Sequence, residues 1–124
     1  MDMVITIIQI ALGLLLTLGG LLKLSYAKYS SLSGVAWSKD FRPEHIRLIG
    51  FLEMTGGVGL IVPPFWPSLT MLTPLAAVGI ALYMSGAMAI HLRRSEYLHM
   101  AGILIFFLVP ALLVAYSSLI GFAA

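Results

Sequence analysis

Glu53 is the residue whose chemistry departs most from its surroundings. It lies within residues 46–62, a run that is apolar enough to enter a bilayer. A carboxyl group at that depth needs a polar partner, a cavity or a functional role, because hydrocarbon does not solvate it. Side chains that can face Glu53 are therefore the first candidates for a functional site.

Lys23 is the first candidate partner. Glu53 lies about 7–8 Å inside the membrane edge at ~1.5 Å per residue, and the same depth on an antiparallel first helix falls at Gly19 and Gly20. Side chains lean toward the N-terminus of their own helix, so Lys23 and Glu53 lean toward each other. We predict an ion pair or charge-assisted hydrogen bond between them. The alternative for Lys23 is a side chain that snorkels to the interface.

Tyr83 and His91 are the other candidates for this polar site. Both lie in the third apolar run, with Tyr83 nearer the depth of Glu53, where its hydroxyl can reach the carboxylate. His91 lies at the end of that run, where the alternative is an ordinary interfacial histidine. The predicted intramembrane polar site therefore comprises Glu53, Lys23, His91 and Tyr83.

Glycines surround the same positions. Small residues let helix backbones approach closely in membranes. A glycine pair on the first run would face a groove on the second, and one glycine in the third run precedes His91. The predicted helix-packing residues are Gly19, Gly20, Gly50, Gly56, Gly57 and Gly86.

The chain lacks the residues that several kinds of chemistry require. The chain has no cysteine, which excludes disulfides, thiol redox chemistry and cysteine-based zinc sites. The three histidines, His45, His91 and His99, have no metal-type spacing with carboxylates, and no Ser-His-Asp set or phosphate loop occurs. We therefore expect no catalytic residue and no metal, and no cofactor other than a bound lipid or quinone; the residues favour a non-enzymatic role over an enzymatic one.

Composition defines the class of protein. The chain has 124 residues, 60% of them apolar and 10% charged, with a mean hydropathy of +1.05. Soluble domains are about 45–50% apolar and about 25% charged. A single integral membrane domain over residues 1–124 is expected, with lipid as its surroundings. Its basic residues cluster at membrane edges, so no nucleic-acid partner is expected.

Four apolar runs predict four membrane spans. Loops of mixed, proline-rich and basic composition separate them, and two of the loops are short. Asp2 and the length of the first run favour a retained helix over a signal peptide, and Pro110 is expected to free the Phe106 carbonyl and bend the fourth span. The prediction is an all-α, up-down-up-down four-helix bundle with spans at about 3–24, 46–62, 69–91 and 98–120.

The distribution of charge predicts the orientation. All seven Lys and Arg residues lie near the loop at 25–45 or near the loop after His91. The positive-inside rule places these loops in the cytoplasm. We expect a multi-pass cell-membrane protein with both termini on the non-cytoplasmic side.

Three segments carry a resemblance to a known family. Residues 19–24, 49–61 and 72–79, the last followed by His91, resemble the DoxX-like family, and the glycine-flanked Glu53 is the most specific part. The resemblance implies a four-helix membrane bundle. Some relatives are associated with quinone-linked sulfur oxidation or thiol stress, and eukaryotic relatives include a chaperone for assembly of pentameric receptors.

Two functions follow as hypotheses. The first is a non-enzymatic, chaperone-like assembly factor or accessory subunit that packs against a membrane-protein partner. The second is a membrane redox accessory subunit that binds quinone or another lipid-soluble ligand near Glu53. A homodimer is also expected, because small residues exceed what one bundle interior uses; examples are Gly13, Gly20, Gly79, Gly86 and Gly102.

The orientation is tested by cysteine labelling of intact cells. The chain has no cysteine, so Asp2→Cys and Ser95→Cys each introduce a single thiol. A membrane-impermeant reagent is expected to label Asp2→Cys, and to label Ser95→Cys only after the cells are permeabilised. Labelling of Ser95→Cys in intact cells would refute the orientation.

Overall fold

The computed structural model describes residues 2–25 and 35–123, and it is all-α. Four helical segments of the described chain are long and apolar enough to cross a membrane: Met3–Leu24, Pro43–Phe65, Leu72–Arg93 and Tyr97–Gly121. The elements are α1 (Met3–Leu24), η1 (Ala36–Asp40), α3 (Pro43–Ile61), η2 (Pro63–Phe65), η3 (Pro67–Leu69), α4 (Leu72–Arg93), α5 (Tyr97–Ile103), η4 (Leu104–Leu108) and α6 (Val109–Ala123). The predicted fold class is confirmed.

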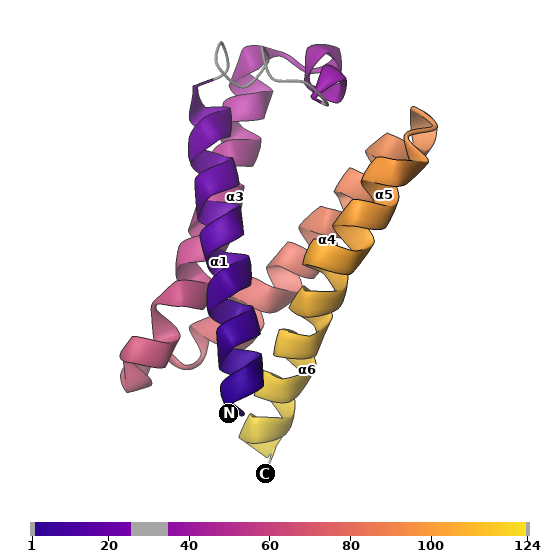
Figure 1. Ribbon diagram of the computed structural model, residues 1–124. Coiled ribbons are helices and arrows are strands. Elements are labelled where there is room, and N and C mark those ends of the chain that lie inside the picture. Colours follow the sequence, from indigo (N-terminus) through magenta and orange to yellow (C-terminus); the bar gives the residue numbers. More distant parts are fainter. Residues whose placement is uncertain (1, 26–34, 124) are drawn as a thin grey trace.

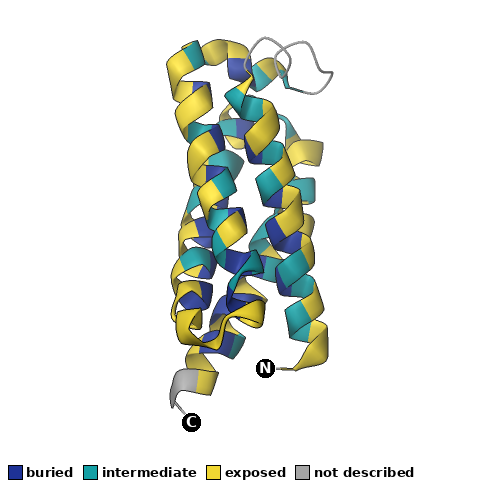
Figure 2. Ribbon diagram, turned by 90° about the vertical axis from the view of Figure 1, so that its left-hand side faces the viewer, coloured by how far each residue is buried: buried dark blue, intermediate teal, exposed yellow. Residues whose placement is uncertain are grey.

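The four spans form two pairs. α1 packs along α3, and α4 packs along α5, η4 and α6. The two pairs converge at the end that holds both termini and the turn after α3, and they diverge toward the other end (Figure 1). Exposed residues cover the outer faces of the helices (Figure 2). The core fills the narrow end and consists of Leu12, Leu16, Leu60, Ala77, Ile80, Ala81, Met84, Ala111, Val114 and Ala115.

Glycines bring α1 and α3 into backbone contact. A Cβ at Gly20 would lie 2.6 Å from the Met54 amide nitrogen, and a Cβ at Gly57 would lie 2.6 Å from the Gly13 carbonyl oxygen. No side chain fits at these points, so the close approach requires glycine. Gly13 and Gly20 are thus used inside the bundle. The expectation that they belong to spare faces for a homodimer is wrong.

Gly86 lies in a different setting from the α1–α3 glycines. A Cβ at Gly86 would meet no atom within 4 Å, and the residue lines a cavity between the helix pairs. The prediction that Gly86 packs a helix is therefore wrong for this chain. The reason is the divergence of α4 from α3 toward this end of the bundle (Figure 1).

The helices α3 and α4 begin and end at residues other than the predicted limits of the second and third spans. α3 begins at Pro43, within polar sequence, because proline suits the first helical turn, where its missing N–H costs nothing. α4 begins only at Leu72, because the 3-10 turns η2 and η3 occupy the proline-rich segment before it. It continues to Arg93, and Ser95 then takes a left-handed conformation with φ of 57°.

A glutamine side chain supplies a hydrogen bond that is missing at the proline-rich end of α3. The Leu60 carbonyl has no α-helical donor, because residue 64 is a proline and lacks an N–H. The Gln9 amide nitrogen donates to that carbonyl at 2.8 Å and to the Thr73 hydroxyl at 3.2 Å. One buried side chain therefore links α1, α3 and α4 at the narrow end.

Pro110 is accommodated by a change of helix type. Residues Leu104–Leu108 form a π-helical segment, in which the Val109 N–H donates to the Leu104 carbonyl. A π segment widens the helix where the proline ring would clash with the carbonyl of the fourth residue before it, Phe106. The span continues through Pro110 as α6 without a break in the chain of helical elements.

Replacing Gly20 by alanine is expected to destabilise the bundle. The added methyl group would press against the backbone of α3 around Gly50 and Met54, at an expected cost of about 1–3 kcal/mol. Gly79→Ala is the matched control, since a Cβ there meets nothing within 4 Å. Unfolding by SDS in mixed micelles gives both free energies, and equal stability of the two variants would contradict the prediction.

Candidate functional site

Lys23 and Glu53 form an ion pair between α1 and α3. The Lys23 ammonium donates to Glu53 Oε2, and the Tyr83 hydroxyl donates to the same oxygen at 2.7 Å. The Glu53 side chain is only 5% exposed and that of Lys23 12% exposed. The predicted pair forms, in place of a lysine that snorkels to the interface. Three of the four spans therefore meet at one carboxylate oxygen.

Glycines make room for this pair. A Cβ at Gly19 would lie 2.6 Å from Glu53 Oε1, and a Cβ at Gly50 would lie 2.6 Å from Lys23 Cβ. The carboxylate thus occupies the space that a side chain on α1 would fill. Gly19 and Gly50, two of the predicted helix-packing residues, therefore lie against the polar pair. Their lack of side chains explains how a charged group fits between two closely packed helices.

The ion pair forms part of the wall of a cavity. The cavity has a volume of about 420 Å³ and lies where the two helix pairs diverge. Lys23, Glu53, Tyr83 and His91 all line it, so the fold brings the four predicted site residues to one place. Their role as a functional site remains a prediction. The rest of the lining comprises Val35, Trp37, Ile49, Met84, Gly86, Ala87, Ile90, His99, Ile103 and Phe107.

His91 has different neighbours from those of Glu53. Its Nδ1 lies 2.9 Å from Glu96 Oε1. Its ring stacks on that of His99 with centroids 5.0 Å apart and planes 10° apart, and Trp37 packs edge-on at 6.1 Å. His91 is therefore the centre of a second polar and aromatic cluster on the cavity wall.

Glu96, His99 and Trp37 also belong to the site, although the sequence did not predict them there. The carboxylate oxygen of Glu96 and the ring nitrogens of His91 and His99 lie within 4.8 Å of one another. The statement that the histidines have no metal-type spacing with carboxylates is thus wrong. Separations of five and eight residues look unpromising along one helix, but a tight turn between two helices brings them together. The left-handed Ser95 marks that turn.

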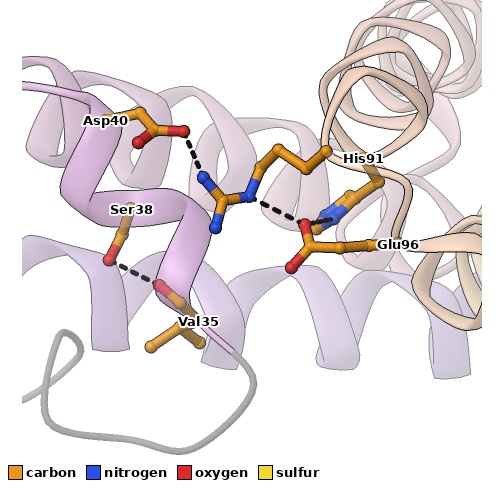
Figure 3. A network of polar contacts seen from close by, with 6 residues as sticks. Val35, Ser38, Asp40, His91 and Glu96 are labelled. Carbon is orange, nitrogen blue, oxygen red and sulfur yellow. Dashed lines mark hydrogen bonds and ion pairs between the residues drawn. The ribbon is translucent and has the colours of Figure 1, made fainter.

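Charged side chains tie η1 to the turn between α4 and α5. Arg94 pairs with Asp40, and its Nε donates to Glu96 Oε1 at 3.0 Å (Figure 3). The hydrogen bond from His91, then that from Arg94, lowers the pKa of Glu96 despite some desolvation. The hydrogen bond to Asp40 raises the pKa of Arg94. Both groups are therefore charged at neutral pH, and the network holds η1 beside the cavity.

Trp37 also connects η1 with the ion pair. The Lys23 ammonium lies 6.0 Å from the centroid of the Trp37 ring, at the outer limit of a cation–π contact. Trp37 thus stands between the cluster at His91 and the pair at Glu53. The loop segment contributes to the site as well as connecting two spans.

The fold and a family comparison together identify the class of protein. Four apolar helices with apolar side chains on their outer surface define a small multi-pass membrane protein in contact with the lipid bilayer. The family model described as the DoxX-like family matches residues 7–116, and the chain belongs to this family. The matched residues include Lys23, Glu53, Tyr83 and His91. No curated protein and no solved structure shows a match to the chain.

A double-mutant cycle tests the ion pair. Lys23→Met leaves a buried carboxylate without its cation, and Glu53→Leu leaves a buried ammonium without its anion. Each single change is expected to destabilise the bundle by about 3–5 kcal/mol. The double variant is expected to lose much less than the sum, because it leaves neither charge unpaired.

Folding free energies in micelles measure this coupling. Lys39→Met is the control, because Lys39 is exposed and its loss is expected to change the stability by less than about 0.5 kcal/mol. Additive effects of the Lys23 and Glu53 changes would show that the contact carries no coupling energy.

Proposed function

We propose that this protein binds a lipid-soluble ligand with a polar head group, of the quinone class, in the cavity beside Glu53. The observation that supports this proposal is the position of the Lys23–Glu53–Tyr83 group on the wall of a 420 Å³ cavity. Ligand sites are commonly concave and apolar, about 300–1,000 Å³ in volume, with a few polar groups that orient the ligand.

The polar wall suits a ligand with carbonyl or hydroxyl oxygens. The Lys23 ammonium and the Tyr83 hydroxyl are donors that converge on Glu53 Oε2. A ligand carbonyl oxygen can accept from a further N–H of the Lys23 ammonium, or from Tyr83 when the single hydrogen of its hydroxyl turns from Glu53 to the ligand. A ligand hydroxyl group can donate to the carboxylate. The same wall can therefore bind both the quinone and the quinol form.

The remaining walls suit a flat apolar ring. Phe107, Ile103 and Ile90 line one part of the cavity, and Trp37 lies near the polar wall. A quinone ring is planar and apolar on both faces, so aromatic and aliphatic side chains can pack against it. In the accessory role proposed here, the chain holds the ligand for a membrane redox partner.

The proposal also places the ligand in one leaflet. The cavity lies at the end of the bundle that carries the described basic residues of both basic loops, among them Lys39, Arg42 and Arg93. The positive-inside rule assigns that end to the cytoplasmic side. The head group would then lie at the level of the cytoplasmic leaflet.

A chaperone-like assembly role, including a homodimer, is the second candidate. Its support is that Gly79 on α4 and Gly102 on α5 have no atom within 4 Å of an added Cβ. Such open small-residue positions let a helix of another chain approach. A membrane-protein partner, or a second copy of this chain, would pack there without using the cavity.

Quenching of tryptophan fluorescence tests the ligand. The chain has two tryptophans; Trp37 lines the cavity, and Trp66 lies between η2 and η3 at the other end. In a Trp66→Phe background in lipid nanodiscs, a short-chain benzoquinone is expected to quench Trp37 with a saturable dependence on concentration. In a Trp37→Phe background, the quenching of Trp66 is expected to rise without saturation.

A tyrosine pair gives the matched variants. Tyr83→Phe removes one donor and is expected to weaken binding about 2–10-fold, as the loss of one hydrogen bond of ~0.5–1.5 kcal/mol predicts. Tyr116→Phe changes an exposed tyrosine on α6 and is expected to leave the affinity unchanged. Unsaturable quenching of both tryptophans would refute the quinone proposal. Recovery of a stoichiometric membrane partner without quinone would then favour the assembly role.

A further inference from the structure

The cluster at the turn between α4 and α5 has the residue types of a metal site. His91 lies at the end of α4, Glu96 immediately precedes α5, and His99 lies in the first turn of α5. Their donor atoms lie within 4.8 Å of one another. Two imidazoles and one carboxylate form a common ligand set for zinc and other first-row transition metals.

The backbone of the turn fixes the positions of the three residues. The Glu96 N–H donates to the His91 carbonyl at 2.8 Å, and the Met100 N–H donates to the Glu96 carbonyl at 3.1 Å. His91 is 6% exposed and packs against Trp37. The three side chains thus extend from one short, hydrogen-bonded unit. Folding therefore already brings them close together, which lowers the entropy that metal binding would have to overcome.

We propose that His91, Glu96 and His99 bind one divalent transition-metal ion of the zinc type. Tetrahedral bonds of about 2.0–2.1 Å place ligand atoms roughly 3.3 Å apart. The Nδ1–Oε1 distance of His91 and Glu96 is 2.9 Å. The donor atoms of the three residues lie within 4.8 Å of one another, so metal binding requires mainly that His99 move closer to His91 and Glu96. The side chain of His99 is exposed and can rotate.

The local charges permit a cation despite the nearby guanidinium. Arg94 pairs with Asp40 and also donates to Glu96, so these three groups together carry a charge of −1. His91 Nδ1 and Arg94 Nε both contact Glu96 Oε1. A metal ion between His91 Nδ1 and Glu96 Oε1 would take the place of the hydrogen that these two atoms share. Arg94, held by Asp40, therefore orients the carboxylate of Glu96 from the side of η1, as outer-shell groups commonly do.

The open coordination position of such a metal ion would face the cavity. His91 and His99 both line the cavity, and Glu96 closes the cluster from the side of the turn. Three protein ligands with an open position are typical of sites that bind water or a further ligand. A metal at this point would present its open position to the same space that Glu53 and Tyr83 face.

Metal uptake by the full-length chain tests the site. Protein purified without a histidine tag is dialysed against Zn²⁺, and bound metal is measured by mass spectrometry. We expect one zinc ion per chain. Co²⁺ is expected to give the visible absorption of a four-coordinate nitrogen–oxygen site, and Zn²⁺ is expected to abolish that absorption by displacement.

Two ligand variants and two controls make the result specific. Glu96→Gln and His99→Asn are expected to weaken zinc binding by at least about tenfold, the lower limit for the loss of even an outer-shell partner. His45→Asn and Glu44→Gln change an exposed histidine and an exposed glutamate at the start of α3, and both are expected to bind zinc as the natural chain does. Helical circular dichroism checks that each variant folds.

The proposal is overturned if the natural chain binds less than a tenth of an equivalent of zinc. It is also overturned if Glu96→Gln and His99→Asn, while folded, bind zinc with the affinity of the controls. The titration contains no quinone, and the quinone titration is made in the presence of a chelator. Failure of either result therefore leaves the other standing.

Discussion

The bundle depends on the close contact between α1 and α3. A carboxylate in apolar surroundings has to be paired, and its cation lies on the neighbouring helix. The pair forms only because Gly20, Gly50 and Gly57 let the two backbones touch, while Gly19 leaves space for the carboxylate. Helix packing and charge neutralisation are thus one requirement. A bulkier α1 would separate the helices and leave Glu53 without Lys23.

The sequence was sufficient to predict most of this contact. Membrane composition, four spans and the depth of Glu53 follow from apolar length, and the helical repeat places Lys23 opposite Glu53. The contact of Tyr83 with Glu53 follows from the same counting of depth. These features are predictable because they depend on local periodicity and on one antiparallel helix pair, whose register is fixed by the membrane edges.

Features that depend on turns and on helix divergence were not predictable in the same way. His91, Glu96 and His99 converge because Ser95 reverses the chain, and residue spacing along a helix gives no sign of this. Gly86 faces open space because α4 diverges from α3, and helix tilt depends on packing over the whole bundle. The Gln9 contact with Leu60 had a usable signal, since Pro64 leaves that carbonyl without a donor.

The unequal ends of the bundle have a consequence for permeation. Large apolar side chains, including Leu12, Leu16 and Val114, are completely or almost completely buried at the narrow end, whereas the cavity occupies the wide end. The bundle therefore has a cavity at one end and a closely packed apolar core at the other. Apolar side chains separate the polar groups of the cavity from the end of the bundle that holds both termini, so the cavity is a recess and does not continue through the described core.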